Sequence, residues 1–403
     1  MQTADPDKGI VSQALREYKE SGPINKVIMA FYVFVPLAFV ARILDLPPLV
    51  IFFVAALGIV PLAKVMGDAT EALAHHAGPG IGGLLNATFG NAVELIISII
   101  ALTKGLTEVV KASITGSIIG NILFVLGLSM FLGGLSRKRQ FFNRIAASAN
   151  ASQMTLAAIA LIVPAIFTST LGNSLNEQGR NDLLENLSLI VSGILLLCYA
   201  AQLIFFLRTH SELSEEAGGD EDNEESKSYE INLSKAEQQL RKEGDTEETA
   251  TWGVRRSVIT LLVATVVVGF VSEVLVSSIE PLTKQLGWTE LFVGVILVAI
   301  IGNAAEHLTA VTVAMKNKMN LSMTIAIGSS LQIAFFVAPV LVFVGFFIGH
   351  PLNLRFEEFE LVCIVASIVI VNLVAGDGES NWFEGLQLLA AYLILAVAFF
   401  LHP

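Results

Sequence analysis

Eleven apolar stretches constrain the fold of this chain, because each is long enough to cross about 30 Å of hydrocarbon. They cover roughly residues 27–45, 49–75, 82–103, 111–134, 146–170, 185–208, 255–280, 289–315, 320–348, 358–375 and 382–401. Hydrophobic residues make up 54% of the sequence and charged residues 15%, which is typical of a chain that lies mostly in a bilayer. The sequence therefore predicts an all-α polytopic membrane protein with about 11 transmembrane helices. The first stretch is expected to remain as an anchor, because no cleavage signature follows it.

One motif occurs twice inside these stretches, 212 positions apart: Gly90-Asn91-Ala92-Val93-Glu94 and Gly302-Asn303-Ala304-Ala305-Glu306. The same offset places Lys104 on Lys316, Gly116 on Gly328 and Ser117 on Ser329 without a gap. Small residues recur in any packed membrane helix, but this does not explain a repeated glutamate. A charged side chain at the bilayer centre costs about 2.5–3.5 kcal/mol on insertion scales, so the repeat indicates a functional site.

The distribution of lysine and arginine predicts how the chain is oriented. With a cytoplasmic N-terminus, the loops on that side hold seventeen of these residues and the opposite loops hold six, which places the C-terminus on the opposite side. The stretches that carry Glu94 and Glu306 are then the third and the eighth, so they cross in opposite directions. The sequence thus predicts two inverted five-helix repeats plus one extra helix, with both glutamates near the membrane midplane.

Four segments follow from this arrangement. They are a cytoplasmic N-terminal segment (1–26) with a faint pattern of an interfacial helix, a first membrane half (27–208), an acidic cytoplasmic loop (209–254) and a second membrane half (255–403). Residues 209–252 contain fourteen acids and four bases, which accounts for most of the net charge of −12. The loop is interpreted as a solvated linker or a sensor, but not as an EF-hand, because Glu225 stands where the turn glycine is required. Cys198 and Cys363 are expected to act as small buried hydrophobes.

Oxygen-bearing side chains surround both glutamates in the expected helices. Asn91 and Ser98 share the helical stripe of Glu94, and Asn303 shares that of Glu306. The next stretches add Ser117, Asn121, Ser329, Ser330 and Gln332. These are hard oxygen donors without cysteine or paired histidine, which suits Ca²⁺ better than zinc or copper. For the serines and Gln332, interhelical hydrogen bonding is an equally good explanation. The glycines near each motif favour a break in the helix, which would also free main-chain carbonyls.

Two carboxylates that face each other in a poorly solvated site resist being ionised together and exchange protons as a coupled unit. A divalent cation stabilises both ionised forms, so binding the cation would expel protons and releasing it would draw them back. This competition is sufficient to exchange a divalent cation for protons if the empty, charged carrier does not reorient easily.

Other titratable residues lie outside the motifs. Glu71, with Asp68 before it, and Glu273 are either a proton relay or helix-end acids that face water, and the sequence leaves both readings open. His307 directly follows Glu306 and points about 100° away around the helix; it either packs through a hydrogen bond or handles protons. The Asp377–Trp382 run predicts a tight turn with helix-capping residues.

With these motifs in view, the chain resembles the calcium/proton exchanger family from about residue 27 to its end, apart from the acidic loop. The resemblance is carried by four runs: Asn86–Glu94, Gly302–His307, Gly328–Gln332 and Asp377–Trp382. It implies a mobile helix pair that hinges against a body of eight helices, with Glu94 and Glu306 as shared carriers of Ca²⁺ and protons. It also implies supporting roles for Asn303, Ser329 and Gln332. Sodium-coupled relatives carry Thr and Ser beside the acid, where this chain has Asn91 and Asn303.

We therefore expect an antiporter that moves cytosolic Ca²⁺, and other divalent cations, across a prokaryotic cell membrane or a vacuolar membrane in exchange for protons. A sodium/calcium exchanger of the same architecture is the alternative. The expected metal ligands are Glu94, Glu306, Asn91, Asn303, Ser117, Ser329 and Gln332, and the expected proton-coupling residues are Glu94, Glu306, His307, Glu71 and Glu273. Enzymatic activity, a cofactor and a nucleic-acid partner are not expected. The protein is expected to lie in a lipid bilayer, either as a monomer or as a homo-oligomer.

Overall fold

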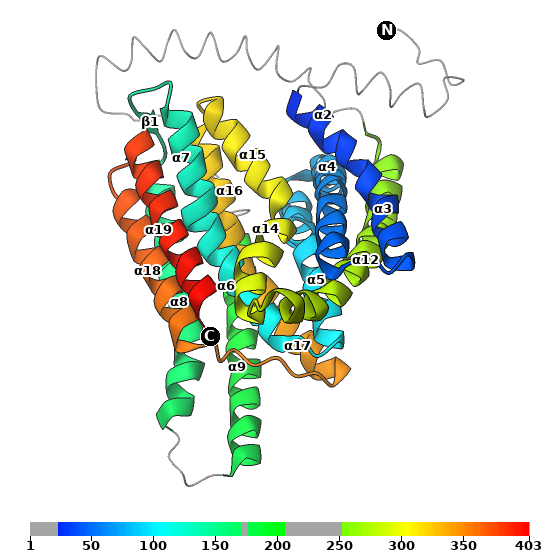
Figure 1. Cartoon of the computed structure of the whole chain (residues 1–403). Helices are drawn as coiled ribbons and strands as arrows, with labels where there is room; N and C mark the ends of the chain where they lie inside the picture. Colours follow the sequence, from blue (N-terminus) through cyan, green and yellow to red (C-terminus); the bar gives the residue numbers. More distant parts are fainter. Residues whose placement is uncertain (1–22, 171–175, 206–251, 403) are drawn as a thin grey trace, which may run out of the picture.

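The computed structural model describes residues 23–170, 176–205 and 252–402, and these are almost entirely helical (Figure 1). Within these ranges, seven helices are long and apolar enough to cross a membrane, and a bent pair of helices makes an eighth span if it is counted as one. The predicted interfacial helix before residue 23 and most of the acidic loop lie outside the described residues. Hence the all-helical membrane architecture is confirmed for the part of the chain that the structure covers.

The first half of the chain contains helices that overlap each predicted apolar stretch. They are α2 (Pro23–Ala30), η1 (Phe31–Val33), α3 (Phe34–Ile43), α4 (Pro48–Phe89), α5 (Ala92–Thr103), α6 (Thr107–Ile119), η2 (Gly120–Val125), α7 (Leu126–Gly134), α8 (Arg144–Thr170) and α9 (Glu177–Ile204). The loop predicted at residues 76–81 is not formed, because α4 continues through it, and α9 begins eight residues before the predicted stretch. The segment of α4 before residue 76 is rich in alanine and leucine, which favour helix.

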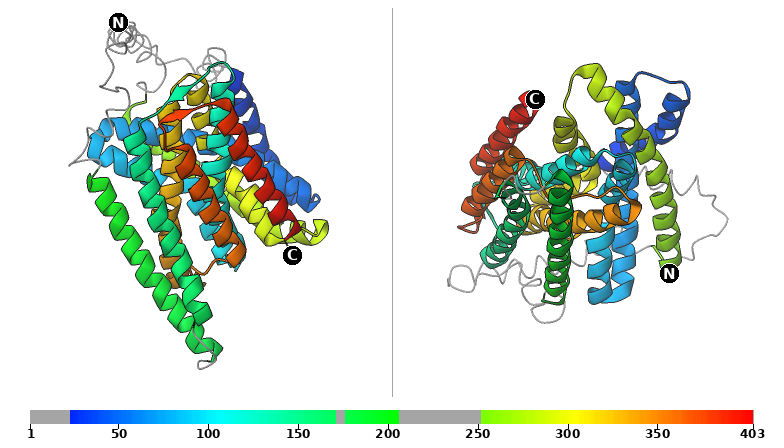
Figure 2. Two further views of the ribbon diagram at one scale, coloured as in Figure 1. Left: turned by 90° about the vertical axis from the view of Figure 1, so that its left-hand side faces the viewer. Right: turned by 90° about the horizontal axis from the view of Figure 1, so that it is seen from below.

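The second half of the chain is also helical. It contains α12 (Val254–Leu286), α13 (Glu290–Phe292), η5 (Val293–Val298), α14 (Ala299–Gly302), α15 (Ala304–Met315), α16 (Met319–Gln332), η6 (Ile333–Val337), α17 (Ala338–Ile348), α18 (Glu358–Val374) and α19 (Trp382–Leu401). Helices α8 and α9 project beyond the other helices at the lower end of the molecule (Figures 1 and 2). Cys198 in α9 is half-buried and Cys363 in α18 is buried, and both are free thiols.

Both motifs interrupt their helices at the same place. Asn91 separates α4 from α5 with φ −99° and ψ 17°, and Asn303 separates α14 from α15 with φ −104° and ψ 9°. The second break bends the chain by 63°. Asparagine suits such a break because its side chain competes for backbone hydrogen bonds, and the Asn303 amide donates to the Ala299 carbonyl at 3.0 Å. The predicted helix breaks are thus confirmed.

Two π-helical turns also fall at matching positions. The offset of 212 places η6 on residues 121–125, which lie inside η2. Single π-turns inside α-helices are frequent at functional sites. Here each one follows the part of a helix that carries candidate ligands, Ser117 in α6 and Ser329 in α16.

Glycines allow the two halves to approach closely. Gly116 in α6 faces the main chain of η5, and a Cβ atom at this position would collide with the Val295 carbonyl. Gly294 in η5 lies in the same way against Ala112 of α6. Small residues at such crossings are the usual means of close helix packing in membranes. On the other side of the molecule, α4 packs extensively against α12.

A short turn and sheet close one end of the molecule. Gly378 has φ +80°, and the Asn381 side chain caps the start of α19 by accepting hydrogen bonds from the amides of Phe383 and Glu384, as the sequence predicts. Strand β1 (Gln140–Phe141) pairs with β2 (Glu379–Ser380) in antiparallel fashion. The sequence does not reveal this sheet, because two-residue strands have no readable periodicity.

Candidate functional site

The two repeated motifs lie against each other. A Cβ atom on Gly302 would be 3.5 Å from the Cβ of Glu94, and a Cβ atom on Gly90 would be 3.5 Å from Oε1 of Glu306. Each motif therefore presents its glycine to the glutamate of the other motif. This reciprocal contact brings together two helix breaks that are 212 positions apart in the sequence.

Glu94 is held by residues from both halves. Glu94 is 2% exposed, and its Oε1 accepts a hydrogen bond from the hydroxyl of Ser117 in α6. The Ser117 oxygen in turn accepts a hydrogen bond from the Asn303 amide at 2.9 Å. The break in the second motif thus helps to position the carboxylate of the first.

A second set of contacts surrounds Glu306. Ser329 in α16 lies beside the Glu306 carboxylate, at the position that its counterpart Ser117 takes beside Glu94. The Asn121 amide donates to the Ser329 hydroxyl at 3.0 Å. The amide of Asn91 donates to Oε1 of Gln332, so the first motif is also tied to the second half. The seven predicted metal ligands therefore lie around the two motifs, which contact each other, and together they form the ion cluster.

Three oxygens of this cluster have no hydrogen-bond partner within the described chain: Oδ1 of Asn91, Oε2 of Glu94 and Oε2 of Glu306, all of which are buried. A buried acceptor without a partner costs about 1–3 kcal/mol, and more when it is charged. Protons or a cation would satisfy all three. Among the described residues, no group of three or more His, Cys, Asp and Glu side chains is placed to hold a metal ion. The donors gathered at the two motifs are carboxylate, amide and hydroxyl oxygens, which is the type that Ca²⁺ prefers.

His307 lies behind this cluster. It is buried, and its Nε2 is 3.0 Å from Oδ1 of Asn121. Because the Asn121 amide nitrogen donates to Ser329, its oxygen is the acceptor and Nε2 of His307 is the donor. Asn121 therefore links the histidine to Ser329, which lies beside Glu306.

The structure does not bring Glu71 and Glu273 into the cluster. Glu71 is exposed on α4, beside Asp68, which pairs with Lys64 at 3.0 Å. Glu273 on α12 is 54% exposed and forms an ion pair at 2.5 Å with Lys104, the residue after α5. Both acids therefore lie on the packed helices α4 and α12, and α12 also contacts α5, the helix that carries Glu94.

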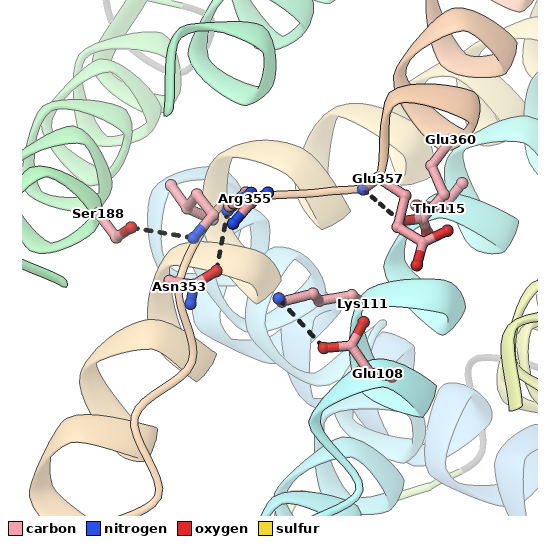
Figure 3. A network of polar contacts seen from close by, with 9 residues as sticks. Glu108, Lys111, Thr115, Ser188, Asn353, Arg355, Glu357 and Glu360 are labelled. Atoms are coloured by element: carbon pink, nitrogen blue, oxygen red, sulfur yellow. Dashed lines mark hydrogen bonds and ion pairs between the residues drawn. The ribbon is translucent and has the colours of Figure 1, made fainter. Parts of the chain in front are cut away.

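A third buried carboxylate was not identified from the sequence. Glu360 is 1% exposed; one of its oxygens accepts from the Thr115 hydroxyl at 2.7 Å and the other from the Glu357 amide at 3.0 Å. Lys111 lies one turn from Thr115 on α6 and pairs with Glu108 at 3.4 Å. Figure 3 shows this network.

The position of this network on α6 separates it from the ion cluster. Thr115 is two residues from Ser117, so the two side chains leave opposite sides of α6. The network thus anchors the side of α6 that is opposite to Ser117, the residue that donates to Glu94. The signal in the sequence was the Glu357-x-x-Glu360 spacing before an apolar stretch, which is typical of a helix start with reciprocal capping.

Comparison with known proteins places these motifs in a family. The chain matches the family model described as sodium/calcium exchanger protein over residues 47–208 and 256–401. It is 49% identical to the Ca(2+)/H(+) antiporter of Synechocystis, over 94% of this chain and 98% of that protein. It is also 45% identical to the Ca(2+)/H(+) antiporter ChaA of Bacillus subtilis, over 91% and 96% of the two chains.

Solved structures agree with this similarity. The fold matches native YfkE with a TM-score of 0.73 and 40% identity, over 92% of this chain and 99% of that chain. It also matches the H+/Ca2+ exchanger CAX with a TM-score of 0.64, over 93% and 92% of the two chains. At 15% identity, the second match concerns the fold alone.

Proposed function

Because the chain belongs to the sodium/calcium exchanger protein family, among its calcium/proton exchangers, we propose that it is a secondary antiporter that exchanges Ca²⁺ for protons at the cluster around Glu94 and Glu306. The observation that carries this proposal is the reciprocal contact of the two motifs, which leaves one buried oxygen on each carboxylate without a hydrogen-bond partner in the described chain. Two carboxylates match the charge of one divalent cation. The protein is a transporter, and no enzymatic step is part of the proposal.

The proposed ligands divide into two groups. Oε2 of Glu94, Oε2 of Glu306 and Oδ1 of Asn91 are the oxygens available to the cation. Ser117 donates a hydrogen bond to Glu94, and Asn303 donates one to Ser117. On the other side, Ser329 lies beside Glu306, and Oε1 of Gln332 accepts a hydrogen bond from the Asn91 amide. Small rotations of the hydroxyl and amide groups would bring their oxygens to the cation, and Ca²⁺ accepts six to eight such ligands.

Exchange follows from the charge of the site. Two ionised carboxylates in a poorly solvated cluster are costly without a counter-charge. The site is therefore stable with Ca²⁺ or with protons, and these compete for the same oxygens. We infer that the empty, doubly charged site does not reorient, so each movement carries one of the two cargoes. His307, linked through Asn121 and Ser329, is proposed to assist proton transfer to the Glu306 side.

We further propose eleven membrane spans in two inverted five-helix repeats plus one extra helix. Seven long spans and the bent pair account for eight; the end of α4 together with α5, then α8 and α18, supply the other three. The matching helix breaks and π-turns support the repeat. In Figure 1, α6 and α7 rise from the lower to the upper end, whereas α16 and α17 descend, which supports an inverted relation.

The packed helices α4 and α12 are proposed to move together against the remaining helices during transport. Glu71 and Glu273 lie on these two helices, and we propose that they line the path by which ions and protons reach the cluster. The start of α2 and the end of α19 lie at opposite ends of the molecule (Figure 1). This supports placing these two ends on opposite sides of the membrane. The distribution of lysine and arginine favours the cytoplasm for the N-terminus, and we propose a cell or vacuolar membrane as the location.

The test is a flux assay in proteoliposomes with an acidic interior. Wild-type protein should take up Ca²⁺ only while the pH gradient lasts, and Glu94→Gln and Glu306→Gln should abolish uptake. Glu280→Gln is the matched control, because Glu280 is exposed at the end of α12; it should transport normally. Full uptake in either motif variant would contradict the proposal, and uptake driven by a sodium gradient alone would favour the sodium/calcium exchanger.

A further inference from the structure

A pocket of about 700 Å³ has no lining residue in common with the ion cluster. It lies at the end of the molecule where α7 and α15 end and α19 begins (Figure 1). Its lining includes three consecutive bases and an aromatic residue at the start of a span. The principal residues are Arg137, Lys138, Arg139, Asp377, Glu379 and Trp382. None of these residues takes part in the exchange described above.

The pocket keeps positive charge that its own acids do not neutralise. Arg139 pairs with Glu379 at 3.1 Å, but Arg137 donates to neutral carbonyl oxygens, those of Met315 at 3.1 Å and Gly133 at 3.3 Å. In the described part of the chain, neither Arg137 nor Lys138 forms an ion pair. Two cationic groups therefore face the pocket with Asp377 as the remaining acid.

Further bases surround the pocket. Arg137 reaches the end of α15, and Gln140 reaches Asn317 at 3.3 Å, so the segment after α7 lies on the α15–α16 turn. Lys316 and Lys318 in this turn are exposed, and the side chain of Arg144 lies beside the turn at Gly378. The six bases of this face outnumber its acids, Asp377, Glu379 and Glu384.

The rim of the pocket is apolar. Leu135 is 60% exposed and Trp382 is 45% exposed, and both belong to the lining. Phe141 and Phe383 beside them are 65% and 52% exposed. In a membrane protein, such side chains at the end of a span lie at the boundary between hydrocarbon and headgroups, where tryptophan is enriched. The pocket therefore combines inner cations with an outer apolar edge at headgroup depth.

We propose that this pocket binds the phosphodiester headgroup of an anionic phospholipid. Arg137 and Lys138 would donate charge-assisted hydrogen bonds to the phosphate oxygens, and Leu135 and Trp382 would contact the start of the acyl chains. Basic pockets between membrane helices are suited to this ligand class. Because Arg137 also holds the last carbonyl of α15, a bound lipid would stabilise the end of the helix that carries Glu306.

The test uses the purified full-length chain in a neutral detergent and counts bound lipid by native mass spectrometry. Phosphatidylglycerol should be retained, whereas phosphatidylcholine with the same acyl chains should not. Lys138→Gln should weaken this retention about fivefold, the effect of one base near a membrane surface. Lys138 is exposed, and no hydrogen bond of the described structure depends on it, so folding should be unaffected. Arg42→Gln, which removes an exposed base at the end of α3, should bind as the wild type does.

Three results would overturn the proposal. Equal retention of both lipids would show that the pocket does not select an anionic headgroup. Displacement of the lipid by inorganic phosphate at a concentration no higher than that of the lipid would identify a free anion as the ligand. Phosphatidylglycerol binding that appears only after deletion of the acidic segment 209–252 would identify that segment as the occupant. The measurement does not depend on transport, so its failure leaves the proposed exchange untouched.

Discussion

Replacing Ser117 by alanine should weaken Ca²⁺ binding without removing either carboxylate. The variant loses the hydrogen bond from the Ser117 hydroxyl to Glu94 and the acceptor for the Asn303 amide. A hydrogen bond to a charged group contributes about 1.5–3 kcal/mol, which corresponds to about 10-fold to 150-fold in affinity. Because the protonated site also loses part of this stabilisation, we expect the lower end, an increase of about tenfold in the half-saturating Ca²⁺ concentration.

The assay measures initial Ca²⁺ uptake into proteoliposomes over a range of Ca²⁺ concentrations at a fixed pH gradient. Ser329→Ala should have a similar effect, because Ser329 occupies the equivalent place beside Glu306. Ser192→Ala is the matched control: Ser192 is buried in α9, and its hydroxyl has no hydrogen-bond partner among the described residues. A half-saturating concentration in Ser117→Ala within about twofold of wild type, or an equal increase in the control, would refute this account of the site.

Three further outcomes follow from the structure. Gly116→Ala should lower the yield of folded protein in detergent size-exclusion chromatography, because its Cβ would meet the Val295 carbonyl and such overpacking costs about 1–3 kcal/mol. Gly120→Ala is the control: its Cβ would meet no neighbouring segment within 4 Å, so the yield should stay at the wild-type level. Glu360→Ala should lower the free energy of unfolding by about 1–3 kcal/mol, because the Thr115 hydroxyl and the Glu357 amide lose their acceptor. The half-saturating Ca²⁺ concentration of this variant in flux assays should stay within about twofold of the wild-type value. Lowering the pH on the Ca²⁺ side should raise the half-saturating Ca²⁺ concentration, because protons and Ca²⁺ compete for the same oxygens; a pH-independent value in uptake measurements would exclude a shared site.

Much of the candidate site could be predicted because its chemistry is repeated within the chain. Glu94 and Glu306 stand out through their cost in an apolar environment, and Asn91 and Asn303 stand out as the places where a glycine-asparagine pair interrupts a helix. The match at a fixed offset also aligned Ser117 with Ser329. These conclusions rest on local composition and spacing, which a single sequence carries in full.

The tertiary structure alone decided which side chains meet. Asn303 bonds to Ser117 across 186 positions and Thr115 to Glu360 across 245, and no periodicity encodes such a pairing. Glu273, a candidate for proton coupling, lies in an ion pair with Lys104 instead of in the cluster. Helical spacing determines the face from which a side chain leaves, but its neighbour depends on how the helices pack. For this protein the sequence therefore determined the apolar helices, the two helix breaks and the two acids, while packing between distant helices decided the hydrogen bonds at the site.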